Sequence, residues 1–243
     1  MVVLFDIDGT LLQGHGVGRA AVHRAIERVH GRTVDTAAVE FSGKTDPAIF
    51  REIASLLLDD ADGASVSDLV RAYEEEMHRS LPTARVEALP GAVDAVERTR
   101  RAGVPTGLLT GNLRPMAFGK VARIGLGEAH FPFGAYGCDD EDRNALPAVA
   151  ARRAAAHLGR DVVHETLVVV GDTPRDIACA RAVGATAVAV ATGRFAADAL
   201  ADADLVLDSL DAFDPAVLGG RSGQRATARR TMTAAPPASA RTT

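Results

Sequence analysis

The sequence predicts an α/β protein, with a doubly wound, mostly parallel β-sheet and an inserted all-helical subdomain. Two observations lead to this fold class. Short, continuous apolar runs alternate with amphipathic stretches along most of the chain, and one long stretch near the N-terminus has no such run. The 243 residues are 47% hydrophobic, which is enough to bury a large core and a smaller accessory one.

Five apolar runs have the composition of strands that are buried on both faces of a parallel sheet. They cover residues 2–5, 104–109, 167–170, 186–191 and 205–207. Four helical patterns lie between them, at residues 92–102, 113–124, 144–158 and 174–183. Glycines at or near the ends of the first two patterns support these bounds, because glycine commonly ends a helix.

Residues 14–89 interrupt this alternation. They contain no convincing strand, and helical spacing of apolar residues predicts helices over 18–30, 47–58 and 66–80. We therefore expect an α/β core over 1–13 and 90–215 and a helical cap over 14–89. Residues 221–243 carry five arginines, no acid and almost no large apolar side chains, so we expect a disordered basic tail.

Charge and composition exclude several classes of protein. Without the five arginines of the tail, residues 1–220 carry 22 cations and 32 acids, a net charge of −10, which argues against nucleic acid as the main partner. No run approaches the roughly 20 apolar residues of a membrane span, and the N-terminus does not resemble a secretory signal. Two cysteines cannot form a disulfide framework, so we expect a cytoplasmic protein with no membrane partner.

Two aspartates, Asp6 and Asp8, follow the first apolar run. Side chains alternate along a strand, so both carboxylates are expected on one side, at the edge where α/β sheets bind ligands. Neighbouring carboxylates repel unless a cation or a shared proton relieves them, and oxygen ligands favour Mg²⁺. Gly9 allows a sharp turn, and Thr10 can offer a hydroxyl and an N–H to an anion. The alternative is a pair of aspartates that caps a turn.

Polar residues also follow two later strands. Thr110, Gly111 and Asn112 come after the run 104–109 and could hold phosphate oxygens, although such a sequence also begins many helices. Asp172 and Asp176 lie in the stretch Gly-Asp-Thr-Pro-Arg-Asp that follows the run 167–170. A helix cap is the alternative for this stretch too. Three strands that deliver acids and a hydroxyl to one edge are hard to explain by caps alone.

With these motifs in this order, the chain resembles the haloacid dehalogenase (HAD) superfamily of phosphatases. Residues 6–10 read DxDGT, like the first motif of that family; Thr110 resembles the second and residues 171–176 resemble the fourth, GDxxxD. The strand-free insertion is similar to the C1-type helical cap of the family. Residues 43–46, Gly-Lys-Thr-Asp, resemble the cap loop that contacts substrate in phosphoglycolate-phosphatase-like members.

The resemblance implies a role for each motif residue. Asp6 would be the nucleophile that forms an aspartyl-phosphate, and Asp8 the general acid and then the general base. Asp6, the backbone carbonyl of Asp8, Asp172 and Asp176 would hold Mg²⁺. Thr110, with the N–H groups around Gly111 and Asn112, would bind a phosphoryl oxygen.

The third motif of the family is a lysine, and here the sequence departs from the pattern. Arg143, 33 positions after Thr110, stands where that lysine is expected. Arginine keeps the positive charge and adds a fork that can contact two oxygens, but it is not equivalent to lysine. Lys120 is the other candidate; it falls within an expected helix, where lysine is usually solvated. We favour Arg143.

The sequence therefore predicts a Mg²⁺-dependent phosphomonoester hydrolase that acts on a small phosphorylated metabolite, with a phosphoglycolate-like ester as the guess from the family. The cap would close over the substrate, with Lys44 as a contact for the leaving group. The alternatives are a phosphosugar mutase with the same nucleophile and a non-catalytic phospho-acceptor or phosphate-binding protein. We expect a monomer or a homodimer.

Overall fold

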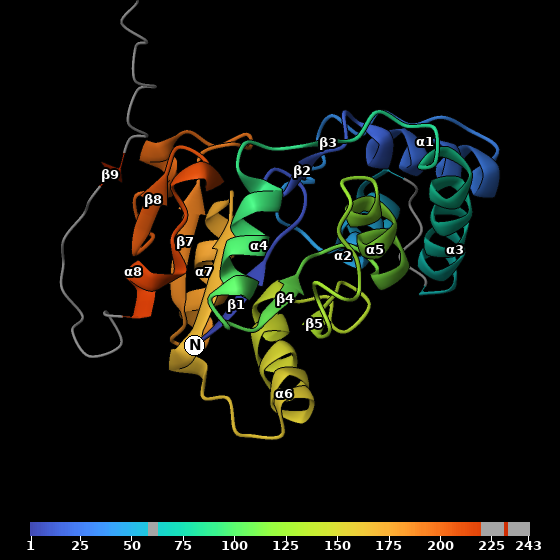
Figure 1. Ribbon diagram of the computed structural model, residues 1–243. Coiled ribbons are helices and arrows are strands. Elements are labelled where there is room, and N and C mark those ends of the chain that lie inside the picture. The colour runs from blue at the N-terminus through green and yellow to red at the C-terminus, as the bar shows by residue number, and fades with distance from the viewer. Residues whose placement is uncertain (58–62, 220–230, 233–243) are drawn as a thin grey trace, which may run out of the picture.

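A computed structural model describes residues 1–57, 63–219 and 231–232, and it confirms the predicted α/β class. Within these residues a parallel sheet runs in the order β5-β4-β1-β6-β7-β8-β9 (Figure 1). Its strands are β1 (Val2–Phe5), β4 (Thr106–Leu109), β5 (Gly134–Ala135), β6 (Leu167–Gly171), β7 (Thr186–Val190), β8 (Leu205–Leu207) and β9 (Thr231–Met232). Three adjacent strands, β4, β1 and β6, are buried along their whole length, as their apolar runs predict.

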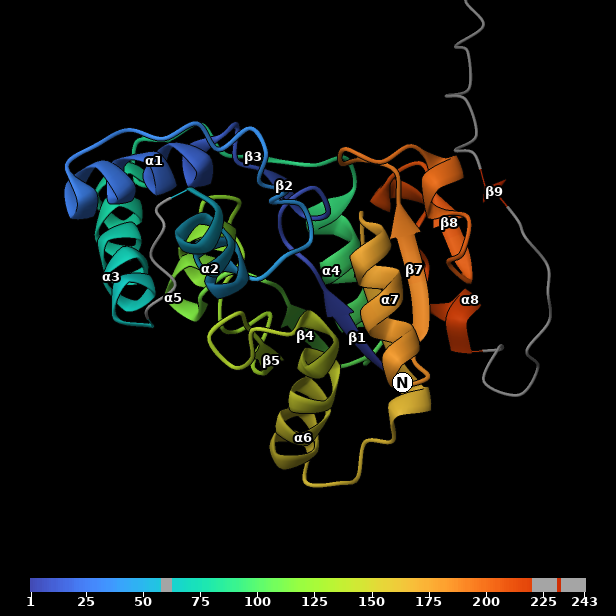
Figure 2. The ribbon, with the colours of Figure 1, turned by 180° about the vertical axis from the view of Figure 1, so that it is seen from behind.

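Helices cover both faces of this sheet (Figures 1 and 2). They are α4 (Ala92–Arg101), α5 (Arg114–Ala122), α6 (Leu146–Leu158), α7 (Pro174–Ala182) and the short α8 (Pro215–Gly219). Val3 and Phe5 of β1 pack in one apolar cluster with α4 and α5, whereas Val2 and Leu4 pack in another with α6 and α7. Alternate side chains of one strand thus serve two cores, which is the doubly wound arrangement that the sequence predicts.

A third apolar cluster belongs to the helices α1 (Val17–His30), α2 (Asp46–Leu57) and α3 (Gly63–Ser80). These helices lie together at one end of the molecule (Figure 1). Within this cluster Phe50 and Tyr73 meet edge to face, with 5.3 Å between their ring centroids. Leu113 and Met116, at the start of α5, also pack in this cluster, so α5 contacts both the sheet and the helical cap.

Two short strands connect the cap helices to the rest of the chain. β2 (Leu12–Gln13) and β3 (Glu87–Ala88) pair antiparallel in a sheet of their own. The expectation that residues 14–89 contain no strand is therefore wrong, because β3 lies near the end of this range. Because β3 is only two residues long and exposed, its sequence carries no alternating pattern that could reveal it.

Other parts of the chain were either not predicted or lie outside the described residues. β5 has no signature in the sequence, because it has only two residues and begins with glycine. The expected disorder of 221–243 falls outside the described residues, except for the two residues of β9, and so does the end of the helix expected over 47–58. Among the described helices, none combines the length and the apolar character that crossing a membrane requires.

Candidate active site

The candidate site lies at the carboxyl ends of the adjacent strands β4, β1 and β6. Thr110, Asp6 and Asp172 are each the first residue after one of these strands. Parallel neighbours end at the same edge, so the three side chains meet there although they are up to 166 positions apart. The structure therefore brings the first, second and fourth motifs together, as the sequence predicts.

Three carboxylates form a buried cluster at this edge. Oxygens of Asp6, Asp172 and Asp176 lie within 4.8 Å of one another, and each residue is at most 5% exposed. Burial, together with the charges of Asp176 and Asp6, raises the pKa of Asp172 to about 8. Burial also raises the pKa of Asp6 to about 6, although the charge of Arg143 opposes this rise. The ionised forms of these buried carboxyl groups are unfavourable without a nearby positive charge, and all the ligand atoms are oxygens. The cluster therefore fits a hard divalent cation such as Mg²⁺.

Two glycines leave room for the carboxylate of Asp172. A Cβ at Gly9, whose φ is 82°, would lie 2.3 Å from Oδ2 of Asp172, and a Cβ at Gly193 would lie 1.7 Å from the same atom. Neither position can carry a side chain without moving that oxygen. Sequence reasoning missed Gly193; the available signal was a glycine just past the carboxyl end of the strand expected over 186–191.

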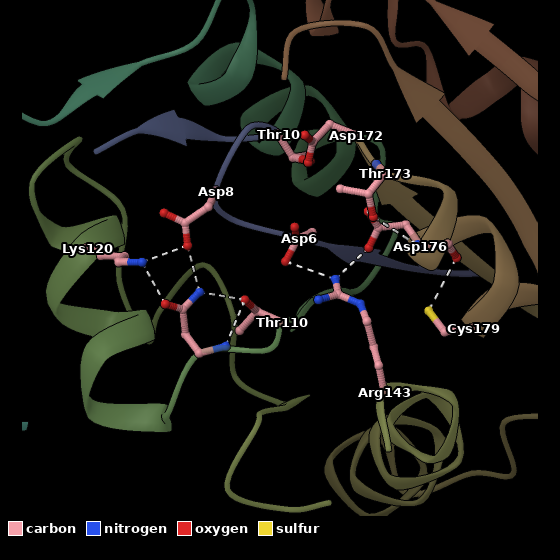
Figure 3. A network of polar contacts seen from close by, with 11 residues as sticks. Asp6, Asp8, Thr10, Thr110, Lys120, Arg143, Asp172, Thr173, Asp176 and Cys179 are labelled. Atoms are coloured by element: carbon pink, nitrogen blue, oxygen red, sulfur yellow. Dashed lines mark hydrogen bonds and ion pairs between the residues drawn. The ribbon is translucent and has the colours of Figure 1, made fainter. Parts of the chain in front are cut away.

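Arg143 contacts two of the three carboxylates (Figure 3). Its Nη2 lies 3.2 Å from Oδ1 of Asp6 and donates to Oδ1 of Asp176 at 2.5 Å. The other oxygen of Asp176 accepts from the N–H and the hydroxyl of Thr173, as a cap at the start of α7. Asp176 is thus held on both oxygens and itself fixes the guanidinium beside Asp6.

Lys120 is also part of the site, so the expectation that it is solvated is wrong. It is 5% exposed, and its Nζ donates to Oδ2 of Asp8 and to Oδ1 of Asn112, both at 2.6 Å. α5 lies between the sheet and the cap, and the sequence of the helix does not reveal what covers each of its faces. Both candidates for the third-motif cation therefore lie in the site, where Arg143 contacts Asp6 and Lys120 contacts Asp8.

The two aspartates of the first motif have different surroundings. Asp8 accepts from Lys120 (Figure 3) and, at 2.8 Å, from Nδ2 of Asn112. Its side chain is 45% exposed. Its carboxylate does not belong to the buried cluster. β1 ends at Phe5, so strand alternation does not extend to Asp8. We expected one cation to relieve the repulsion between the two carboxylates. In the structure each carboxylate has its own cationic side chain, Arg143 for Asp6 and Lys120 for Asp8.

Thr10 differs from its expected role as an anion contact. Its hydroxyl donates to Oδ1 of Asp172 at 3.2 Å, and its N–H is directed at the carbonyl of Ile7. It is fully buried. Both donors are thus engaged within the protein, and Thr10 orients the carboxylate of Asp172.

A cavity of about 300 Å³ opens beside these groups, between the core and the cap. Its core wall includes Asp6, Asp8, Gly9, Thr110, Gly111, Asn112, Lys120, Arg143 and Asp172. Arg19, Lys44, Asp46 and Tyr73 line it from the cap, together with apolar side chains. Lys44 forms an ion pair with Glu52 within the cap. Every residue of the predicted site except Thr10 and Asp176 faces this one cavity.

The loop 43–46 of the cap lies directly against the core. The N–H of Asp46 donates to the carbonyl of Gly111 at 2.8 Å, and Oδ2 of Asp46 accepts from the N–H of Leu113 at 2.9 Å. A Cβ at Gly111 would lie 2.1 Å from the carbonyl oxygen of Lys44. Burial raises the pKa of Asp46 to about 6. The sequence pointed to this loop but not to the contact of Asp46 with the start of α5.

Comparison with known proteins identifies the family. The family model of haloacid dehalogenase-like hydrolases matches residues 1–184, about three quarters of the chain. The chain belongs to the haloacid dehalogenase-like hydrolases. None of the curated proteins compared with it matches. The predicted resemblance and the prediction of a hydrolytic enzyme are thereby confirmed.

Solved structures of the HAD fold are similar over nearly the whole chain. CbbY from Rhodobacter sphaeroides, solved in complex with phosphate, has a TM-score of 0.71 and 20% identity over 87% of this chain and 95% of its own. A predicted phosphoglycolate phosphatase from Haemophilus somnus has a TM-score of 0.68 and 16% identity, over 86% and 94%. A predicted phosphatase from Clostridium acetobutylicum has a TM-score of 0.69 and 16% identity, over 90% and 98%. At these identities the likeness establishes the fold.

Proposed function

We propose that the protein is a Mg²⁺-dependent phosphomonoester hydrolase that works through an aspartyl-phosphate at Asp6. One observation carries the proposal: a buried carboxylate cluster, the hydroxyl of Thr110 and the guanidinium of Arg143 surround one cavity beside Asp6. Asp6, Asp172 and the backbone carbonyl of Asp8 would hold the metal, with Asp176 beside them. Bound Mg²⁺ supplies positive charge that neutralises phosphoryl oxygens.

The reaction needs two proton transfers, and Asp8 is the group for both. A carboxylate oxygen of Asp6 forms a bond to phosphorus while the bond from phosphorus to the ester oxygen breaks, and Asp8 gives its proton to that oxygen. Asp8 then takes a proton from a water molecule whose oxygen attacks the phosphorus of the aspartyl-phosphate. This step returns inorganic phosphate and restores the Asp6 carboxylate. Asp8 is half exposed in the cavity, so it can reach both the leaving group and water.

Positive charge and hydrogen-bond donors are arranged for the phosphoryl group itself. Arg143 is 7% exposed and lies against Asp6, so its charge acts where water screens it little. Its Nε is a buried donor with no partner among the described residues. Thr110, Gly111 and Asn112 face the same cavity from the end of β4. Phosphoryl transfer depends mainly on positioning and charge neutralisation, which these groups supply.

The size of the cavity limits the substrate to a small organic phosphate. A phosphoglycolate-like ester is the starting hypothesis, with the cap loop at Lys44 as the contact for the leaving group. Because Lys44 is paired with Glu52, its charge is partly neutralised before any substrate binds. We expect this substrate to be a cytoplasmic metabolite.

The test is a screen of small phosphate esters for phosphate release, with Mg²⁺ and with a chelator, beside Asp6→Asn. Asp204→Asn, which alters an exposed ion pair with Arg181 far from the site, is the matched control. We expect Mg²⁺-dependent release by the wild type and the control and none by Asp6→Asn. Full turnover by Asp6→Asn or in strong chelator contradicts the proposal. Isomerised phosphosugar without free phosphate indicates the mutase instead.

A further inference from the structure

Lys120 is one of only two lysines in the chain, and the reaction steps above assign it no role. It lies on α5, not on any strand that carries a motif. We infer that Lys120 is a positioning residue, which orients the acid–base group Asp8 both directly and through Asn112, and the phosphate-binding hydroxyl of Thr110 through Asn112. This inference rests on the proposed phosphatase reaction.

The first argument is the burial of Lys120. Its side chain is 6% exposed, and its ammonium reaches one charged and one neutral acceptor at 2.6 Å. Removing an ammonium from water is costly unless it is paired and hydrogen-bonded, and a lysine that served only solubility would remain at the surface. The burial of Lys120 therefore indicates that it has a function within the site.

The second argument is the orientation of the amide of Asn112. Lys120 has only donors, so the amide atom beside its Nζ must be the oxygen. The amide nitrogen then faces the opposite way, where it donates to Oδ2 of Asp8 and to Oγ1 of Thr110, both at 2.8 Å (Figure 3). An ionised Asp8 also selects the nitrogen on its own side, but Asp8 loses this selectivity when it carries its proton, and Lys120 then still fixes the amide.

The oriented amide determines which oxygen of Asp8 can work. Oδ2 accepts from both Lys120 and Asn112, so the proton that Asp8 transfers belongs on Oδ1. Oδ1 lies on the side of Gly14, at 3.9 Å from the place of a Cβ there, and Asp8 and Gly14 both line the cavity. Lys120 thus holds the carboxyl group of Asp8 with its working oxygen toward the cavity.

The same amide determines the direction of the Thr110 hydroxyl. Oγ1 of Thr110 accepts from Nδ2 of Asn112 and lies 3.4 Å from the backbone N of Asn112. Because the oxygen already accepts, its own proton is free to be donated to another group. Thr110 lines the cavity, where a phosphoryl oxygen would be the acceptor.

The test compares two esters that differ in their need for an acid. Departure of an alkoxide from an alkyl phosphate needs protonation by Asp8, whereas 4-nitrophenolate leaves readily without it. We expect Lys120→Met to lower kcat/KM about 100-fold for an alkyl phosphate, within the usual contribution of general acid catalysis, and about tenfold or less for 4-nitrophenyl phosphate. The ratio of kcat/KM values is the readout, because a merely structural defect lowers both alike.

Val121→Ala is the matched control, since Val121 is the fully buried neighbour on the same helix and packs in the core. It should lower the melting temperature and leave the ratio of kcat/KM values unchanged. Should Lys120→Met fail to fold, Lys120→Gln tests the same ratio. Equal losses for both esters in an otherwise active enzyme overturn the inference alone. A wild type that hydrolyses neither ester overturns the proposed function, and this inference with it.

Discussion

Removal of divalent metal should make the stability of this protein fall as the pH rises from about 5 to 8. Burial raises the pKa of Asp172 to about 8 and that of Asp6 to about 6, whereas both are near 3.8 in an unfolded chain. Between these values the folded state binds more protons than the unfolded state, so its free energy of unfolding decreases with pH. The stability that comes from these two protonated carboxyl groups is fully present below about pH 4. It is lost as the pH rises through their folded-state pKa values of about 6 and about 8.

The size of the effect follows from the two pKa values. Between pH 5 and 8 the folded protein keeps the proton of Asp172 over about three pH units and that of Asp6 over about one. At about 1.4 kcal/mol per unit, the loss is on the order of 5 kcal/mol. In a domain of this size that corresponds to a fall of roughly 10–20 °C in melting temperature. Carboxyl groups whose pKa is lowered, such as Asp139, lose their contribution below this window.

The assay is thermal unfolding in a chelator and in excess Mg²⁺ at pH 5.5, 6.5, 7.5 and 8. Bound metal neutralises the cluster, so Mg²⁺ should raise the melting temperature most at pH 8 and remove the part of its pH dependence that comes from the cluster. Asp46 lies outside the cluster, and its pKa of about 6 leaves a smaller dependence in place. Asp172→Asn should be more stable than the wild type in chelator at pH 8 and insensitive to Mg²⁺. A wild-type melting temperature that stays flat or rises with pH in chelator, or an Asp172→Asn protein that Mg²⁺ still stabilises, refutes the reasoning.

Two substitutions test other parts of the site. Gly9→Ala should lose nearly all activity and about 1–2 kcal/mol of stability, because Gly9 has a positive φ and its Cβ would meet Asp172. Gly125→Ala, where φ is also positive but nothing lies within 4 Å, should lose similar stability and keep its activity; equal activities would contradict the role of Gly9. Arg143→Lys should lower kcat/KM about 100-fold, since a single ammonium cannot replace the guanidinium fork between Asp6 and Asp176; near-normal turnover would show that charge alone suffices.

The fold was largely predictable because its central strands are buried on both faces. Such strands have continuous apolar sequences, and the runs before Asp6, Thr110 and Asp172 stand out from the helical patterns around them. β3 and β5 could not be predicted, because two-residue strands are defined by their partners and not by their own sequence. Gly134 even weakens the strand signal at β5.

The candidate site was predictable to the extent that it lies at strand ends. Residues directly after parallel neighbours must come together, and Asp6, Thr110 and Asp172 do. Side chains that enter from helices follow no such rule. Met116 of α5 packs against the cap, and Lys120, one helical turn later, is buried beside Asp8 and Asn112; this burial arises from tertiary packing, which helical periodicity does not encode.

In the proposed reaction, a separate cationic side chain beside each aspartate of the first motif lets two carboxylates only two residues apart do different work. Arg143 keeps its charge at every relevant pH and lies against Asp6 and Asp176, where a fixed positive charge favours an ionised nucleophile. Lys120 and Asn112 hold only one oxygen of Asp8 and leave the other at the cavity. A group that must first give and then take a proton needs one free oxygen with access to water, whereas a nucleophile needs a fixed direction. In the proposed reaction, the arginine at the position of the family's lysine would therefore serve the nucleophile, and the lysine on α5 would orient the acid–base group.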